Sequence, residues 1–136
     1  MVATQEINWN SIENLVKILS NDILELPRYF SSITTVSRGG LIPSRLLADA
    51  LGINKIFVDQ KNISSESLFV DDIFDTGQTF KNIFCKVDDP SKFIFATLFA
   101  RRGMKYPDQL MYAEKTFDTS YVVFPWDKFE FEKTLK

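Results

Sequence analysis

The stretch that decides the fold is residues 68–79, LFVDDIFDTGQT, where an apolar run leads into two adjacent carboxylates and a short turn. Residues 68–70 predict a buried strand. Residues 74–79 predict a tight turn, and apolar residues then recur at helical spacing from 80 to 87. A strand, a turn and a helix in this order are the repeating unit of α/β proteins.

This unit carries groups that suit a phosphorylated sugar. Gly77 allows a backbone to approach a ligand closely, and the amides of residues 75–79 lie where a helix begins and attract phosphate. Two threonine hydroxyls add donors there. The carboxylates of Asp71 and Asp72 suit ribose hydroxyls, or a Mg²⁺ ion held together with ligand oxygens. The predicted ligand-binding residues of the segment are Asp71, Asp72, Asp75, Thr76, Gly77, Gln78 and Thr79.

Two other interpretations of the segment are weaker. Asp-Thr-Gly alone is common in a surface turn with an aspartate cap, but that leaves the preceding strand and its two acids unexplained. An aspartyl-phosphatase site needs two aspartates one residue apart after the strand, and Asp72 and Asp75 do not fit.

The rest of the chain alternates short apolar strands with amphipathic helices. We therefore expect one α/β domain over residues 1–136, with a mostly parallel five-stranded sheet flanked by helices. The expected helices cover 12–23, capped by Asn10 or Ser11, then 43–51 and 80–87. The expected strands are 33–36, 55–58, 68–70, 93–99 and 121–124, and residues 102–120 look polar and irregular.

Chemistry-bearing residues follow three of these strands. Residues 37–40, Ser-Arg-Gly-Gly, come after the first strand, the two acids after the third, and Arg101 with Arg102 after the fourth. Ligands of such sheets bind beyond the carboxyl ends of the strands. Three strand ends of this kind indicate one site more strongly than any one of them.

Composition limits the chemistry and the partners. The 136 residues include no His and one Cys, and the net charge is −2. Histidine-based catalysis and the usual structural zinc sites are excluded. The acidic balance argues against nucleic acid as a partner, and without a signal peptide or a spanning apolar run we expect a cytoplasmic protein with no membrane partner.

The segment Val70–Thr79 resembles the signature of type I phosphoribosyltransferases, which is an apolar strand, two acids, two variable residues and Asp-Thr-Gly-x-Thr. The resemblance implies that the chain binds phosphoribosyl pyrophosphate with Mg²⁺. It implies that Asp71 and Asp72 hold the ribose hydroxyls directly or through the metal, that residues 75–79 hold the 5′-phosphate, and that Asp75 is the general base near N7 of a purine.

Residues 35–43, TVSRGGLIP, look like the pyrophosphate loop of the bacterial xanthine-guanine branch. The resemblance implies that the loop binds pyrophosphate and often has a cis peptide bond between Ser37 and Arg38. Arg38 is a cation suited to assist departure of the pyrophosphate, and glycine amides can face it. The predicted pyrophosphate-binding residues are Ser37, Arg38, Gly39 and Gly40.

Resemblance to the same branch also implies a purine site. Arg101 stands where the branch has a Lys that hydrogen-bonds the purine O6, and Arg is not a conservative replacement for Lys. Tyr121 aligns with an aromatic that stacks on the base, and Val122 with a carbonyl that receives an exocyclic group. Asp127 ends a Pro-Trp-Asp tripeptide typical of the branch. Tyr121, Val122 and Asp127 belong to a small C-terminal hood, which is expected over about 102–136 together with an N-terminal part.

One feature departs from the family pattern. The family carries a long flexible loop between the second and third predicted strands that closes over the pyrophosphate, whereas here the whole connection is residues 59–67. Nine residues reach roughly 30 Å, and the crossing needs about 20 Å. We therefore expect a shortened flexible loop and an almost lidless site, in which water competes with the purine.

The resemblance as a whole implies a pentosyltransferase. Phosphoribosyl pyrophosphate and a 6-oxopurine (guanine, xanthine or hypoxanthine) would give a nucleoside 5′-monophosphate and pyrophosphate. The alternative is a weakly active or non-catalytic regulatory protein of the same fold that binds a nucleotide or phosphoribosyl pyrophosphate. The 13 Phe and the family's habit suggest a homo-oligomer, a dimer or tetramer.

Overall fold

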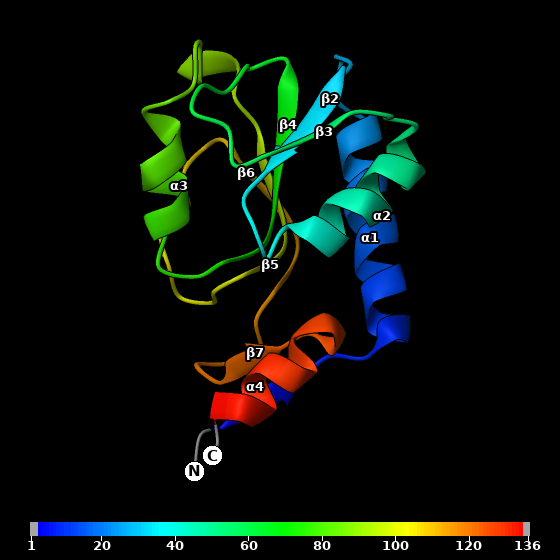
Figure 1. The fold of residues 1–136 in the computed structure, drawn as a ribbon, viewed down its shortest axis with the longest axis vertical. Coiled ribbons are helices and arrows are strands. Elements are labelled where there is room, and N and C mark those ends of the chain that lie inside the picture. Colours follow the sequence, from blue (N-terminus) through cyan, green and yellow to red (C-terminus); the bar gives the residue numbers. More distant parts are fainter. Residues whose placement is uncertain (1–2, 135–136) are drawn as a thin grey trace.

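The centre of the molecule is a five-stranded sheet in which every pairing is parallel (Figure 1). The computed structural model describes residues 3–134. The strand order is β3 (Ile56–Val58), β2 (Ser32–Thr35), β4 (Ser67–Phe74), β5 (Phe95–Ala100) and β6 (Leu110–Lys115). The expected α/β class is thus confirmed. Within residues 3–134, no helix is both long enough and apolar enough to cross a membrane.

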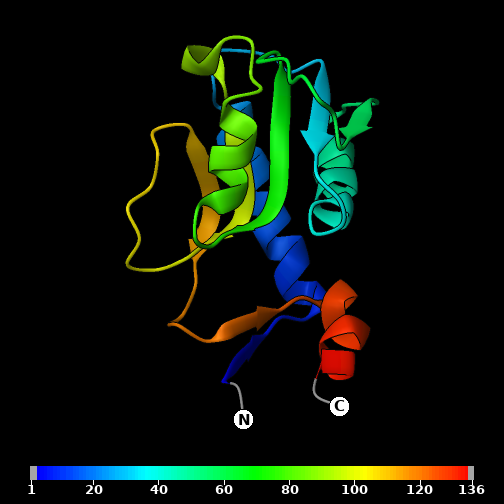
Figure 2. The ribbon, with the colours of Figure 1, turned by 60° about the vertical axis from the view of Figure 1, so that its left-hand side comes forward.

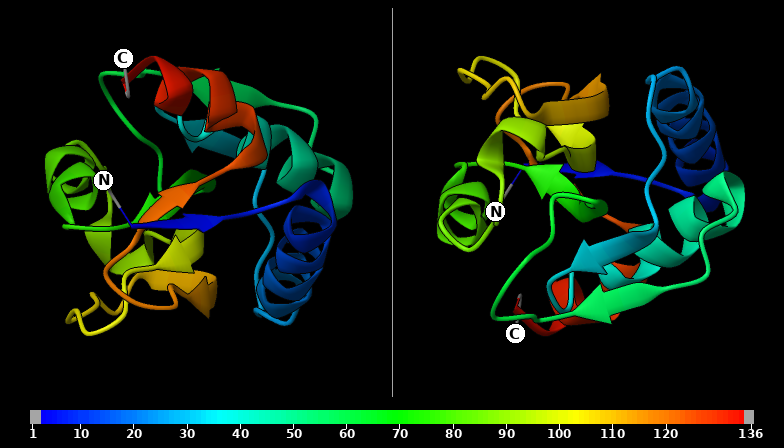
Figure 3. Two further views of the ribbon diagram at one scale, coloured as in Figure 1. Left: turned by 90° about the horizontal axis from the view of Figure 1, so that it is seen from below. Right: turned by 90° about the horizontal axis from the view of Figure 1, so that it is seen from above.

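Helices cover both faces of this sheet. α1 (Trp9–Leu24) and α2 (Leu41–Leu51) lie on one face and α3 (Gln78–Phe84) on the other, as the end-on views of Figure 3 show. The α1 cap is Asn8, whose side chain accepts the Ser11 N–H at 2.8 Å, and not Asn10 or Ser11 as expected. Gly52 ends α2 in the left-handed conformation at φ 71°, which glycine adopts at low cost.

The two faces of the sheet have different cores. Aliphatic side chains fill the space under α1 and α2, among them Ile12, Leu19 and Leu47. Under α3, phenylalanine rings fill the space, and Phe95 contacts four other rings at centroid distances of 5.1–6.5 Å. Many of the phenylalanines therefore serve the core, and they fix a helix of only seven residues.

The fifth strand of the sheet differs from the expectation. Residues 121–124 do not join the main sheet; instead, β6 at 110–115 is its edge strand, inside a segment expected to be irregular and part of the hood. Its side chains are half-buried or exposed. Because an edge strand has only one strand neighbour, its side chains stay partly exposed, and it lacks the continuous apolar run that identifies a central strand.

The hood is a small second layer at one end of the sheet (Figure 2). Its two strands are β1 (Thr4–Glu6), which was not expected, and β7 (Tyr121–Val123), paired in parallel. The single-turn helix η2 (Pro125–Asp127) and α4 (Lys128–Thr134) come after β7. A second single-turn helix, η1 (Pro90–Lys92), lies before β5. The hood thus joins the beginning and the end of the described chain.

The short connection between β3 and β4 is packed against its neighbours. Ile63 is buried and exchanges two backbone hydrogen bonds with the segment after α3, from Ile63 N–H to Lys86 O and from Asp88 N–H to Ile63 O, both at 3.0 Å. The Ser65 amide donates to the Asp88 carboxylate at 2.8 Å, and its carbonyl accepts from Arg28 at 2.8 Å. The loop is short, as expected, and these contacts are in keeping with the expected lack of a long mobile lid.

We expect Phe95→Ala to destabilise the fold by about 3–5 kcal/mol, because the ring is fully buried among other aromatic rings. Chemical denaturation would measure this. Phe117→Ala is the matched control: that ring is 78% exposed, so its loss should change stability by less than about 0.5 kcal/mol. Similar losses for both variants would contradict the assignment of the ring cluster as the core under α3.

Candidate functional site

The site is where the order of the strands reverses. The strands β2 and β4 lie side by side; from β2 the sheet continues to β3 on one side, and from β4 it continues to β5 and β6 on the other. The β2–β4 ladder ends at the pair Thr35 and Val70, while β4 continues to Phe74 beside β5 alone. β4 is therefore longer than expected, and Asp71 and Asp72 belong to the strand itself. This gives them an open flank at the switch point, where ligands of such sheets bind.

The predicted pyrophosphate loop closes this flank. Residues 37–40 run from the end of β2 to the start of α2, and the Thr35 hydroxyl donates to Val70 O at 2.6 Å. A Cβ on Gly39 would come within 2.8 Å of an Asp72 carboxylate oxygen, and one on Gly40 within 1.9 Å of the Thr35 hydroxyl. The two glycines thus bring the loop backbone directly onto the strand end.

Ser37 begins this loop with a cis peptide bond to Arg38, as the resemblance implies. Its N–H and hydroxyl both donate to the carboxylate of Asp59, at 2.9 and 2.5 Å. Arg38 comes next in the chain, between the Ser37 contact and the two glycines. Asp59 is a contact that the sequence gives no reason to expect.

Asp71 and Asp72 are adjacent carboxylates in a shielded position. Asp71 is only 7% exposed, and burial raises its pKa. Burial and the neighbouring Asp71 raise the pKa of Asp72 to about 8. Each carboxylate accepts the amide of the next residue, at 2.9 and 2.8 Å. In the absence of a cation, burial and mutual repulsion therefore favour the protonated form of this pair.

The turn after β4 has the form expected of a phosphate site. Gly77 is the N-cap of α3 at φ 85°, and the Thr76 hydroxyl accepts the Gln78 N–H at 3.3 Å. Thr79 stands in the first turn of α3. A pocket of about 160 Å³ is lined by the residues from Asp71 to Phe80, together with Phe95. The predicted sugar-phosphate residues therefore surround one cavity.

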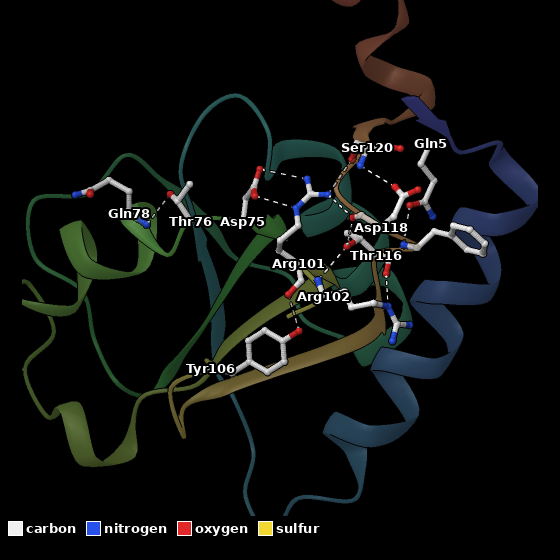
Figure 4. Close-up of polar contacts among 11 residues, drawn as sticks. Gln5, Asp75, Thr76, Gln78, Arg101, Arg102, Tyr106, Thr116, Asp118 and Ser120 are labelled. Atoms are coloured by element: carbon white, nitrogen blue, oxygen red, sulfur yellow. Dashed lines mark hydrogen bonds and ion pairs between the residues drawn. The ribbon is translucent and has the colours of Figure 1, made fainter. Parts of the chain in front are cut away.

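Arg101 connects this turn to the hood (Figure 4). Its side chain, 13% exposed, pairs with Asp75 through Nε at 3.0 Å and through Nη2 at 3.4 Å. Its Nη1 donates to the carbonyls of Asp118 and Ser120 at 3.1 and 2.8 Å. A guanidinium has five N–H groups; within residues 3–134, these contacts occupy four of them and leave one on Nη2. Two residues predicted for separate roles thus form one ion pair.

The other predicted purine residues lie in the hood. Tyr121 comes directly after Ser120, is 51% exposed and stacks on Phe131 of α4 at 5.5 Å. Val122 is buried in β7, and Asp127 lies further along the chain in η2. Tyr121 is therefore adjacent in sequence to the Arg101 contact, whereas Asp127 is separated from it by β7.

Several contributing residues escaped prediction. Asp59 and Thr35 hold the loop at 37–40, and the Arg102 guanidinium donates to Thr116 O at 3.0 Å behind Arg101. A strand-end aspartate and two threonines carry no motif, and their partners are distant in sequence. Among residues 3–134, no group of three or more His, Cys, Asp or Glu side chains could hold a metal without help from a ligand.

Comparison with solved structures supports the fold. The xanthine-guanine-hypoxanthine phosphoribosyltransferase of Helicobacter pylori superimposes with a TM-score of 0.77 at 16% identity, covering 96% of this chain and 99% of that one. The purine phosphoribosyltransferase of Pyrococcus horikoshii gives a TM-score of 0.71 at 23% identity, covering 90% and 93%. Similarity at these identities concerns the fold alone. No protein-family model matches the chain.

Sequence relatives carry the assignment further. The xanthine-guanine phosphoribosyltransferase of Idiomarina loihiensis is 30% identical over 145 residues, which cover 89% of this chain and 85% of the relative. The match runs over more positions than this chain has residues, which means that the relative has residues in the matched region that this chain lacks. With this identity over most of both chains, on the fold and strand-end geometry described above, the chain belongs to the xanthine-guanine phosphoribosyltransferase family of purine phosphoribosyltransferases.

Proposed function

We propose that this purine phosphoribosyltransferase acts on 6-oxopurines, transferring the phosphoribosyl group of phosphoribosyl pyrophosphate to guanine, xanthine or hypoxanthine. The observation that carries the proposal is the Arg101 guanidinium, held between Asp75 and the hood with one N–H left over. A 6-carbonyl oxygen accepts such a donor. The 6-amino group of adenine would oppose it donor to donor.

In this arrangement each strand end would bind a different part of the substrate. The turn 75–79 would bind the 5′-phosphate through its amides and the hydroxyls of Thr76 and Thr79. Asp71 and Asp72 would bind the ribose hydroxyls or the metal, and the loop 37–40 the pyrophosphate. Tyr121 would stack on the purine, with the Val122 carbonyl and Asp127 near its edge. The pocket lined by residues 71–80 supports the sugar-phosphate part of this arrangement.

The reaction would exchange one bond at the sugar C1. The bond from C1 to the pyrophosphate oxygen breaks, and a bond from C1 to the purine nitrogen N9 forms. Arg38 would pair with the charge that develops on the leaving pyrophosphate. Asp75 would hold and accept the proton at N7, since Arg101 fixes its carboxylate beside the hood.

The donor set fits Mg²⁺. Two neighbouring carboxylates, with substrate oxygens completing the sphere, are how proteins commonly hold this ion. Asp71 is buried and Asp72 half-buried, and both accept backbone amides and have raised pKa values, each consistent with a site whose charge is balanced by a ligand. When bound, the ion would supply positive charge beside the pyrophosphate.

The short connection between β3 and β4 favours the second candidate function, a weakly active nucleotide-binding protein. The contacts of Ile63 and Ser65 fix that connection in place, so it is not free to close over the site as a lid. An open site lets water reach C1 in place of the purine. The two candidates differ in turnover and agree in binding phosphoribosyl pyrophosphate with Mg²⁺.

We expect steady-state assays with phosphoribosyl pyrophosphate and Mg²⁺ to show nucleotide formation with guanine, xanthine or hypoxanthine and none with adenine. Pyrophosphate release without any purine should be measurable, because the connection between β3 and β4 is packed against its neighbours and not free to close over the site. Tight binding without nucleotide formation would favour the regulatory alternative. Turnover of adenine would contradict the role given to Arg101, and an absence of purine-independent release would contradict the open site.

We expect the double variant Asp71→Asn, Asp72→Asn to weaken Mg²⁺-dependent binding of phosphoribosyl pyrophosphate by about 100-fold or more, since it removes both charged ligands. Titration calorimetry would measure this. Asp49→Asn is the control, because that carboxylate lies on the exposed side of α2, where it pairs with Arg45 at 3.2 Å. Undiminished binding by the double variant would place the substrate site elsewhere.

We expect the metal-free protein to lose stability as the pH rises from about 4 to 8. The pKa of Asp72 is raised to about 8 in the folded chain, so the folded state binds more protons than the unfolded state in this range. Asp72→Asn should flatten this dependence and stabilise the protein at pH 8 by about 1 kcal/mol or more.

Thermal unfolding measured across this pH range would detect the effect. Mg²⁺ should raise the unfolding temperature of the unsubstituted protein more at pH 8 than at pH 5, since metal binding displaces protons. A variant with the same pH dependence as the unsubstituted protein would contradict the burial of this carboxylate.

A further inference from the structure

The predicted pyrophosphate loop is held by a residue outside it. Asp59 comes directly after β3, and its carboxylate accepts the Ser37 N–H through Oδ1 at 2.9 Å and the Ser37 hydroxyl through Oδ2 at 2.5 Å. These two hydrogen bonds lower the pKa of Asp59. A charged acceptor that binds two groups of one residue fixes both the position and the orientation of that residue.

The backbone of Asp59 is itself specialised for this contact. Its φ of 54° lies in the left-handed region, and Asp59 is the single residue other than glycine with a positive φ among residues 3–134. Asp and Asn tolerate this conformation better than most residues. The Asp59 N–H donates to Thr35 O at 3.0 Å, so the residue is fixed to the end of β2 by its backbone and to the loop by its side chain.

The loop is consequently fixed at both ends. At its start, Ser37 is bound to Asp59. At its end, Gly40 packs on the Thr35 hydroxyl, while Gly39 lies against Asp72. The segment after Asp59 is immobilised through Ile63 and its bonds to the chain after α3. The loop therefore keeps its shape without contacts from a closing lid.

We propose that Asp59 is a positioning residue that preforms the loop 37–40 for the pyrophosphate of the substrate. The inference rests on the proposed function of that loop. Asp59 touches no reacting atom in this role. It acts through Ser37, whose position determines the positions of the Arg38 backbone and of the Gly39 and Gly40 amides that follow it.

The test uses two variants of the full chain. Asp59→Gly removes the carboxylate and keeps a residue that adopts φ 54° freely, so backbone strain does not obscure the result. Asp59→Asn keeps one carbonyl oxygen for the Ser37 N–H and tolerates the same φ. Hydrogen exchange at the amides of residues 37–40 and the KM for phosphoribosyl pyrophosphate are the two measurements.

We expect Asp59→Gly to speed exchange of the Ser37 amide about 10-fold or more and to raise the KM for phosphoribosyl pyrophosphate about 10-fold, in keeping with loss of hydrogen bonds to a charged group. The KM for the purine should stay unchanged. Asp59→Asn should recover part of both effects. Asp49→Asn, on the outside of α2, should match the unsubstituted protein.

Unchanged exchange at residues 37–40 in Asp59→Gly would overturn the proposal, as would equal changes in the KM of both substrates. Should that variant fail to fold, hydrogen exchange at residues 37–40 in Ser37→Ala decides instead, because this change removes the hydroxyl half of the contact. The KM of Ser37→Ala is not used, since Ser37 is itself a predicted pyrophosphate-binding residue. If the unsubstituted protein shows no transferase activity, the proposed function fails, while the exchange measurement still decides whether Asp59 fixes the loop.

Discussion

The site depends on one mismatch in the sheet: β2 stops at Thr35 while its parallel neighbour β4 continues to Phe74. Beyond Val70, one flank of β4 has no strand beside it. In the interior of a sheet this would leave polar backbone groups unpaired, which is costly. Here the loop that follows β2 fills the flank, and the Thr35 hydroxyl donates a hydrogen bond to the Val70 carbonyl. The same gap gives two carboxylates a shielded position that a ligand can reach.

Packing on the other face of the sheet fixes the turn after β4. α3 is too short to be stable alone, and its rings Phe80 and Phe84 pack with Phe93 and Phe95. This aromatic contact determines where the turn 75–79 begins. Arg101 then joins that turn to the hood. Rigid packing therefore sets the turn proposed to bind the sugar phosphate, and a charged side chain links it to the part proposed to bind the purine.

The sequence was informative where residues close in the chain act together. The strand, turn and helix around residues 68–79 were predictable because periodicity and glycine position are local signals. The loop at 37–40 was predictable for the same reason. β6 was missed because an edge strand buries little of its surface, and β1 because three residues carry no pattern. The Asp59–Ser37 and Arg101–Asp75 contacts join residues 22 and 26 positions apart, which only the folded chain reveals.

The parallel pairing of β1 with β7 has a consequence for the order in which the protein forms. Residues 4–6 find their partners at 121–123, so the hood cannot assemble on a ribosome until nearly the whole described chain has emerged. The sheet and the sugar-phosphate turn need only earlier segments. Closing so long a loop is slow compared with the local contacts of the helices. A nascent chain would therefore complete the turn proposed for the sugar phosphate first and the hood proposed for the base last.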